Sequence, residues 1–290
     1  MDFTGIYTAL ATPYDKDMQV NLCALEKLIE KNLEMGVSGF FVCGSSAEAF
    51  LLSVEERKAI MQTVKECVGK RVPLIAHIGA ISTAFTAELG KKAKELGYDA
   101  VSSVAPFYHK FSFAEIKKYF EVVAAESELP MFIYNIPAFT GVQFTIEQLL
   151  ELLSIKNVIG IKHTSGDYMQ LRQMKTEFPE KIIYNGYDET FLAGLVMGAD
   201  GAIGSNFNFM ADKFIRIRRM FLENKIPEAM RLQDETTRII TIIYKYGLAP
   251  SIKAILKAQG IDCGVCRAPF KALTAEEEKS LLAEVLPYLA

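Results

Sequence analysis

Short apolar segments recur along this chain of 290 residues and alternate with stretches of helical periodicity. Several of these segments are too apolar to alternate with polar residues, as expected for parallel strands that are covered on both faces. The predicted strands are Ile6–Ala11, Gly39–Cys43, Val72–Ile78, Ala100–Ala105, Met131–Ile136, Val158–Lys162, Ile182–Asn185 and Gly201–Ser205. A strand followed by a helix, eight times over, predicts an α/β fold of the (β/α)8 TIM-barrel type.

Helix signals support this order and continue beyond it. Gly36 is a typical stop for the helix that precedes it, and Ser53 and Thr145 each open a capping-box pattern. We expect the barrel to occupy residues 1–225 and a C-terminal three-helix extension of the same domain to occupy residues 226–290, because no linker or low-complexity tract separates them. The helices expected in the extension are Pro227–Tyr246, Ser251–Gln259 and Thr274–Leu289.

Composition excludes several classes of function. The formal net charge is −3 and the basic residues are scattered, so no nucleic-acid partner is expected. The N-terminus lacks the features of a signal peptide, and no apolar segment is long enough for a membrane span. These features predict a soluble, cytoplasmic protein. The five cysteines are expected to be free thiols, and the Cys263–Cys266 pair to be structural, because no second pair or nearby histidine completes a metal site.

Lys162 is the strongest candidate for chemistry. It lies near the end of a predicted buried strand, where an amine is costly to bury unless it is paired or has lost its proton. A desolvated lysine can form a Schiff base with a carbonyl substrate; a lysine that extends from the strand end into solvent is the alternative. Strand alternation puts Lys162 on one face with Gly160 and Thr164, and Tyr134 holds the matching position on the preceding strand, about 4.8 Å away.

Two further polar groups follow predicted strands. The hydroxyls and backbone N–H groups of Ser45 and Ser46 can hold a carboxylate, although a plain strand-to-helix turn is the alternative. The turn lacks the glycines and lysine of a phosphate loop. Asp188 and Glu189 can bind hydroxyls, or can simply be acids at a helix start. No metal is expected, since no histidine lies at ligand spacing.

Together these residues resemble the pyruvate-dependent class I aldolase family that includes dihydrodipicolinate synthase and N-acetylneuraminate lyase. The resemblance covers nearly the whole chain, from Ala11-Thr12-Pro13 to the Cys266–Phe270 segment. Within the family, the segments most similar to the lyase are 134–138, 162–167, 184–189 and 200–205.

The resemblance implies reversible cleavage of N-acetylneuraminate to N-acetylmannosamine and pyruvate, without a cofactor. Lys162 would form a Schiff base with the C2 ketone, and Tyr134 would take the proton of the C4 hydroxyl. Ser45 and Ser46 would hold the pyruvate carboxylate and relay protons with Tyr134. Tyr108 resembles the family tyrosine that reaches the pocket of a neighbouring subunit, which implies a homotetramer. The residues implied to bind the sugar are Thr164, Gly186, Asp188, Glu189 and Ser205.

The chain departs from the family at two positions. The loop after the second strand carries Ala47 where the family usually has glycine, and alanine lacks glycine's freedom at positive φ, so a different loop backbone is expected. Asn206 stands where lyases often carry threonine. Both changes bear on substrate detail.

Three other functions compete with the lyase. The synthase carries an arginine for its aldehyde substrate's carboxylate where this chain has Phe139, whose ring cannot make that charge-assisted pair. Another aldolase or dehydratase of the family, acting on a different 2-keto acid, is a second alternative. A non-catalytic sugar-binding barrel is a third, because a fold by itself does not fix a function.

Overall fold

The computed structural model describes residues 1–289 and forms a closed barrel of eight parallel strands in sequential order. The strands are β1 (Gly5–Ala9), β2 (Gly39–Val42), β3 (Leu74–His77), β4 (Ala100–Val104), β5 (Met131–Asn135), β6 (Val158–His163), β7 (Ile182–Asn185) and β8 (Gly201–Gly204). This architecture confirms the predicted TIM barrel, and each observed strand overlaps the apolar segment predicted for it.

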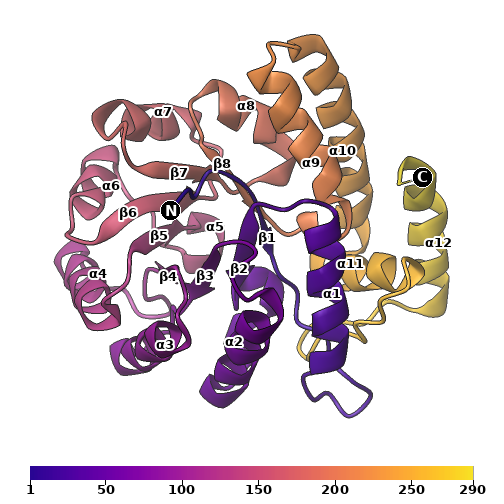
Figure 1. Cartoon of the computed structure of the whole chain (residues 1–290), viewed down its shortest axis with the longest axis horizontal. Coiled ribbons are helices and arrows are strands. Elements are labelled where there is room, and N and C mark those ends of the chain that lie inside the picture. The colour runs from indigo at the N-terminus through magenta and orange to yellow at the C-terminus, as the bar shows by residue number, and fades with distance from the viewer. Residues whose placement is uncertain (290) are drawn as a thin grey trace.

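Helices surround the strands as a ring (Figure 1). The barrel helices are α1 (Leu22–Glu34), α2 (Val54–Val68), α3 (Thr83–Leu96), α4 (Phe113–Ser127), the short α5 (Pro137–Thr140), α6 (Ile146–Leu153), α7 (Tyr168–Glu177), α8 (Phe191–Val196) and α9 (Phe207–Leu222). The predicted start signals are confirmed, because Ser53 and Thr145 both form complete capping boxes. Gly36, just after α1, has a φ of 85° that favours glycine.

Three helices follow the barrel: α10 (Ile226–Tyr246), α11 (Leu248–Ala258) and α12 (Ala275–Val285). α10 packs along α9, and α11 contacts both of them, at one side of the barrel (Figure 1). Because this packing is continuous with the main core, we propose that residues 226–290 belong to the same domain as the barrel of residues 1–225. Within residues 1–289, no single helix is long and apolar enough to cross a membrane, although α10 and α11 taken together would be, with a 113° bend between them.

The barrel interior is filled largely by aromatic side chains. Tyr7 and Phe132 both pack against Tyr184 with ring centroids 5.3 Å apart, and all three are fully buried. The hydroxyl of Tyr184 donates a hydrogen bond to the carbonyl oxygen of Phe3, which ties the N-terminal segment to the barrel interior. This packing is the floor beneath the polar groups at the carboxyl ends of the strands.

Candidate active site

A cavity of about 560 Å³ opens at the carboxyl ends of the strands. In TIM-barrel enzymes this end of the barrel carries the catalytic residues. Nine of the ten residues predicted for the site line this cavity: Ser45, Ser46, Tyr134, Lys162, Thr164, Gly186, Asp188, Glu189 and Ser205.

Lys162 projects from β6 into the barrel and is only 4% exposed. In the sheet it pairs with Tyr134 on β5 and with Tyr184 on β7. The pairing with Tyr134 was predicted from the sequence. Its Nζ lies 4.2 Å from the centroid of the Tyr134 ring and 4.8 Å from that of Phe41. Within residues 1–289, no carboxylate forms an ion pair with this amine. The amine therefore faces aromatic rings and the cavity, and is not held by an acid.

Gly160 shares the inner face of β6 with Lys162, and its environment explains why it is glycine. A Cβ at this position would lie 2.0 Å from the carbonyl oxygen of Ile182 and 2.9 Å from a ring carbon of Phe132. Strand alternation placed Gly160 on the same face as Lys162. The structure shows that the nearest obstacle is the backbone of the neighbouring strand β7.

Two hydroxyl pairs connect the turn after β2 to the opposite walls of the cavity. Ser45 Oγ lies 3.4 Å from the hydroxyl oxygen of Tyr134, and Ser46 Oγ lies 2.5 Å from Ser205 Oγ. Each pair can pass a proton or orient its donor toward a ligand, because hydroxyl groups both donate and accept. The turn therefore presents two hydroxyls, one on the Tyr134 side and one on the β8 side.

The backbone of this turn does not need glycine at position 47. Residues Ser45–Ala47 form a 3₁₀ turn, and the positive φ angles lie at Cys43 (59°) and Glu48 (58°) on either side of it. Ala47 is buried and its carbonyl accepts a hydrogen bond from Thr12 Oγ1 at 2.9 Å. Ala47 itself is not among the residues with positive φ, so alanine fits the backbone of this turn without strain.

Thr164 and Gly186 lie against each other at the ends of β6 and β7. A Cβ on Gly186 would be 1.9 Å from Thr164 Oγ1, so any larger residue would displace the threonine hydroxyl. That Oγ1 is buried and has no hydrogen-bond partner in the described part of the chain. Buried hydroxyls are normally paired. The unpaired Oγ1 of Thr164 is therefore a candidate to bind a ligand group in the cavity.

Asp188 is held by Asn206 across the top of β7 and β8. Its Oδ2 accepts hydrogen bonds from the backbone N–H of Asn206 at 2.9 Å and from Nδ2 of the same residue at 2.8 Å. Burial raises the pKa of Asp188 to about 6, although the Asn206 hydrogen bonds oppose that shift. Sequence reasoning noted Asn206 only as a departure from the family; the structure shows that it positions one of the predicted acids.

Helix α10 holds both the backbone and the side chain of Glu189. Tyr244 donates a hydrogen bond to Glu189 Oε1 at 3.0 Å, and Thr237 Oγ1 donates to the Glu189 carbonyl at 3.0 Å. Gln233 Nε2 donates to the carbonyl of Asp188 at 3.2 Å. The extension thus positions the 188–190 turn.

Sequence reasoning missed that the extension also forms one wall of the cavity. The wall comes from the α10–α11 junction and from the segment before α12. The only signal in the sequence was that no linker separates the extension from the barrel. Its residues are Tyr244, Tyr246, Gly247, Leu248, Ala249, Pro250, Ile252, Lys253, Phe270 and Lys271.

Tyr108 is the predicted site residue that does not line the cavity. It is 85% exposed after β4, with a positive φ of 79°, and its ring packs beside that of His109. His163 is adjacent to Lys162 on β6 but is buried against Asn135, and its Nδ1 lies 3.1 Å from Asn135 Nδ2.

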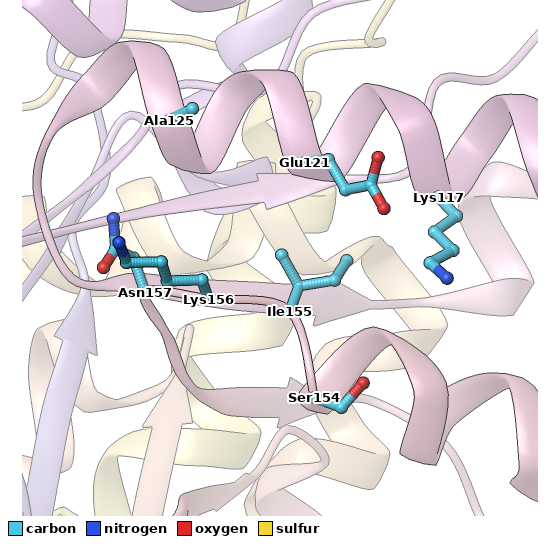
Figure 2. Close-up of a pocket in the computed structure, with 7 residues that line it drawn as sticks. All are labelled: Lys117, Glu121, Ala125, Ser154, Ile155, Lys156 and Asn157. Carbon is cyan, nitrogen blue, oxygen red and sulfur yellow. The ribbon is translucent and has the colours of Figure 1, made fainter.

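Other features contribute no chemistry to the site. All five cysteines are free, and burial raises the pKa of Cys263 and Cys266 to about 12. Among the described residues, no three His, Cys, Asp or Glu side chains are grouped to hold a metal ion. A second cavity of about 580 Å³ lies between α4 and the segment that leads into β6, and Figure 2 shows that Lys117 and Glu121 are its charged side chains on α4. This cavity lies at the amino end of β6, whereas Lys162 is near the carboxyl end of that strand.

Comparison with known proteins agrees with this geometry. The model of the dihydrodipicolinate synthetase family matches residues 2–286. The chain belongs to this family. It is 42% identical to N-acetylneuraminate lyase 2 of Escherichia coli O6:H1, over 100% of the chain and 94% of that protein. Among solved structures, it resembles CdNal from Clostridium difficile in complex with mannosamine, with a TM-score of 0.97, 38% identity and coverage of 99% of this chain and 100% of the other. It also resembles N-acetylneuraminate lyase from Fusobacterium nucleatum complexed with pyruvate, with a TM-score of 0.92, 39% identity and coverage of 98% and 97%.

Proposed function

We propose that this chain is a class I aldolase that cleaves N-acetylneuraminate reversibly to N-acetylmannosamine and pyruvate. The observation that carries the proposal is the buried amine of Lys162, which faces a cavity and lies within 4.2 Å of the Tyr134 ring centre. Full-length similarity to N-acetylneuraminate lyases supports the choice of substrate.

Lys162 is the proposed nucleophile. Its amine attacks the C2 ketone of the open-chain sugar acid, and loss of water from the carbinolamine gives an iminium ion. The iminium provides an electron sink for the bond that breaks. Ser45 and Ser46 hold the carboxylate next to C2, as their hydroxyls at the cavity wall allow.

Tyr134 is the proposed acid–base residue. It removes the proton of the C4 hydroxyl, the C3–C4 bond breaks, and its electron pair forms the enamine of pyruvate while N-acetylmannosamine leaves as the aldehyde. Protonation of the enamine at C3 and hydrolysis of the resulting iminium release pyruvate and free Lys162. The Ser45 hydroxyl, 3.4 Å from that of Tyr134, gives the proton a route to and from the tyrosine.

The sugar hydroxyls are proposed to bind on the β6–β8 side of the cavity. The free Oγ1 of Thr164 and the carboxylates held by Asn206 and α10 support this assignment. Hydroxyl groups that meet fixed acceptors are discriminated strongly, because the acceptors are left unpaired when the hydroxyl is absent. The proposed sugar-binding residues are Thr164, Gly186, Asp188, Glu189 and Ser205.

The synthase alternative is not favoured by the site. Phe139 lines the cavity at the position where the synthase carries arginine, and a phenyl ring cannot pair with the carboxylate of the synthase substrate. A homotetramer in which Tyr108 reaches a neighbouring pocket and a cytoplasmic location remain predictions from the sequence. Sedimentation of the purified protein tests the first.

The decisive experiment combines turnover with chemical trapping. N-acetylneuraminate cleavage is followed as pyruvate release, coupled to lactate dehydrogenase and the loss of NADH absorbance. Borohydride reduction in the presence of pyruvate should add one pyruvate-derived mass at Lys162, and Lys162→Ala should abolish both trapping and turnover while the fold is kept. Lys271→Ala is the matched control, since Lys271 lines the same cavity but pairs with Glu277 at 3.0 Å. Turnover near wild type in Lys162→Ala would refute the mechanism. Trapping without cleavage would keep the Schiff base and move the proposal to another 2-keto acid.

A further inference from the structure

A buried ion pair connects the turn after β2 to the C-terminal extension. Lys253 Nζ of α11 lies 2.8 Å from Glu48 Oε1, and the two side chains are 3% and 1% exposed. Lys253 also lines the cavity that holds Lys162. The pair therefore lies beside the candidate active site and joins two segments that are distant in the sequence.

Both charges have further partners. Glu48 Oε2 accepts a hydrogen bond from the backbone N–H of Arg267 at 2.8 Å. Lys253 Nζ donates to the carbonyl oxygen of Val265 at 3.0 Å and lies 4.2 Å from the centre of the Tyr14 ring. The carboxylate thus fixes the segment before α12 as well as α11, and the ammonium is paired, hydrogen-bonded and stacked.

Arg267 extends the connection to the other side of the turn. Its guanidinium donates to the carbonyl of Leu51 at 3.0 Å and to that of Met18 at 2.7 Å. It also pairs with both carboxylate oxygens of Glu56, the capping-box acid of α2. The extension therefore holds the segment from Glu48 to Glu56 at several points.

Glu48 is joined to the turn that carries the serine hydroxyls by backbone hydrogen bonds. The backbone N–H of Glu48 donates to the carbonyl of Ser45 at 3.0 Å, and that of Ala47 donates to the carbonyl of Gly44 at 3.1 Å. Glu48 has a left-handed backbone, with φ 58° and ψ 35°, which costs free energy in a residue other than glycine. Tertiary contacts must hold that conformation, and the side chain of Glu48 makes such contacts through Lys253 and Arg267.

Stability alone does not account for a buried pair. The free energy needed to remove two charges from water is about as large as the free energy gained from their attraction. Replacing such a pair with apolar residues of similar volume therefore often leaves the stability unchanged. An ion pair differs from apolar packing in direction and charge, because it fixes one arrangement of the groups that carry it. At this location, the group that is fixed is the turn bearing Ser45 and Ser46.

We propose that Glu48 and Lys253 are positioning residues that hold the Ser45–Ser46 turn in the geometry that binds the substrate carboxylate. The C-terminal extension then supports the chemistry through this pair as well as forming a wall of the cavity. This inference rests on the proposed function, since it assigns the turn to the carboxylate of a 2-keto acid.

The test removes both charges together and keeps the shapes. Glu48→Gln combined with Lys253→Met avoids an unpaired buried charge, and Glu48→Gln combined with Lys253→Gln provides a second neutral variant if the first folds poorly. The matched control is Lys257→Met with Glu278→Gln. That pair starts one turn further along α11, is more exposed and has an Nζ–Oε1 distance of 3.4 Å.

The readout compares a charged ketone with a neutral one. Borohydride trapping of Lys162 is measured with pyruvate and with ethyl pyruvate, which keeps the ketone and lacks the carboxylate. In the double variant we expect the half-saturating pyruvate concentration and the KM for N-acetylneuraminate to rise about tenfold or more, as for loss of a charge-assisted contact, while trapping by ethyl pyruvate stays within about twofold. The control pair should leave all three unchanged.

The outcomes separate this inference from the proposed function. A folded variant that keeps its preference for pyruvate over ethyl pyruvate overturns the positioning role. An equal loss with both ketones also overturns it, because that result indicates general damage to the site. Wild-type protein that is not trapped by pyruvate at all would instead refute the Schiff-base function.

Discussion

Replacing Tyr134 by phenylalanine removes one hydroxyl group and keeps the ring that shapes the site. The ring is 3% exposed and packs against Phe41 and His77 with centroids 5.7 and 5.8 Å away. Its contact with Lys162 Nζ, 4.2 Å from the centroid, uses the ring face and does not involve the hydroxyl. The substitution therefore isolates the proton-transfer role of the tyrosine from its packing role.

The expected effect on the rate is much larger than the effect on stability. A positioned acid–base group contributes about 10²–10⁴ in rate, or roughly 3–5 kcal/mol of barrier. Among residues 1–289, the hydroxyl makes one hydrogen bond, to Ser45 at the long distance of 3.4 Å. Loss of such a bond costs about 1 kcal/mol or less of folding free energy. We expect kcat to fall at least a hundredfold and the melting temperature to change by a few degrees at most.

Two assays on the same preparation check this prediction. Coupled pyruvate release gives kcat, and borohydride trapping with pyruvate reports whether Lys162 still forms the iminium ion. Tyr246→Phe is the matched control, because Tyr246 lines the same cavity but its hydroxyl donates to Glu284 Oε1 at 2.6 Å. The control should keep kcat within about threefold, since its hydroxyl is engaged by the surface of the extension.

Either of two results would refute the reasoning. A kcat for Tyr134→Phe within threefold of wild type would remove the tyrosine from proton transfer. Complete loss of trapping in a folded variant would mean that the hydroxyl is needed to form the Schiff base, so that the fall in kcat could not be assigned to cleavage of the C3–C4 bond.

Three further predictions concern stability. Gly160→Ala puts a Cβ 2.0 Å from the carbonyl oxygen of Ile182, and such overpacking should cost about 1–3 kcal/mol; an unchanged melting temperature would contradict it. Burial raises the pKa of Asp188 from 3.8 to about 6, so the wild type loses up to roughly 3 kcal/mol of unfolding free energy as pH rises through this interval. Denaturant titrations should show that the unfolding free energy of Asp188→Asn rises relative to that of the wild type between pH 4 and 7. If the unfolding free energies of the two proteins change in parallel with pH, Asp188 does not carry a buried charge. Burial lowers the pKa of His77 to about 3 and that of His163 to about 4, so each histidine binds a proton on unfolding below pH 6.5. As the pH falls further, each of them lowers the unfolding free energy by about 1.4 kcal/mol per pH unit. His163→Gln should reduce that slope between pH 6.5 and 4.5, and an unaltered slope would exclude His163 as a source of acid sensitivity.

Local rules predicted the strands, the helix starts and the pairing of Lys162 with Tyr134 across two strands. The capping boxes at Ser53 and Thr145 depend on residues three positions apart, so the sequence contains all of their information. Strand alternation likewise placed Lys162 on an inner face, and matching strand positions paired it with Tyr134. These predictions succeeded because they need only the period of a strand and the order of the strands in a barrel.

Contacts between distant segments could not be predicted in the same way. Glu48 and the backbone of Arg267 are 219 positions apart, and nothing in either local sequence indicates that they meet. The pairing of Asp188 with Asn206 depends on how two adjacent loops fold over the strand ends. The sequence also could not show where this turn takes its positive φ angles, which lie at Cys43 and Glu48 and not at Ala47.

The sequence by itself determined the barrel, the inner face of β6 and the identity of the polar groups at the strand ends, because periodicity and strand order act over short distances. The tertiary structure alone decided which of these groups touch and what holds them. The α10–α11 wall of the cavity, the support of Glu189 by Tyr244 and the burial of Lys253 against Glu48 all arise when the extension packs back on the barrel. Side-chain contact across that interface depends on three-dimensional packing, which the spacing of residues along the chain does not encode.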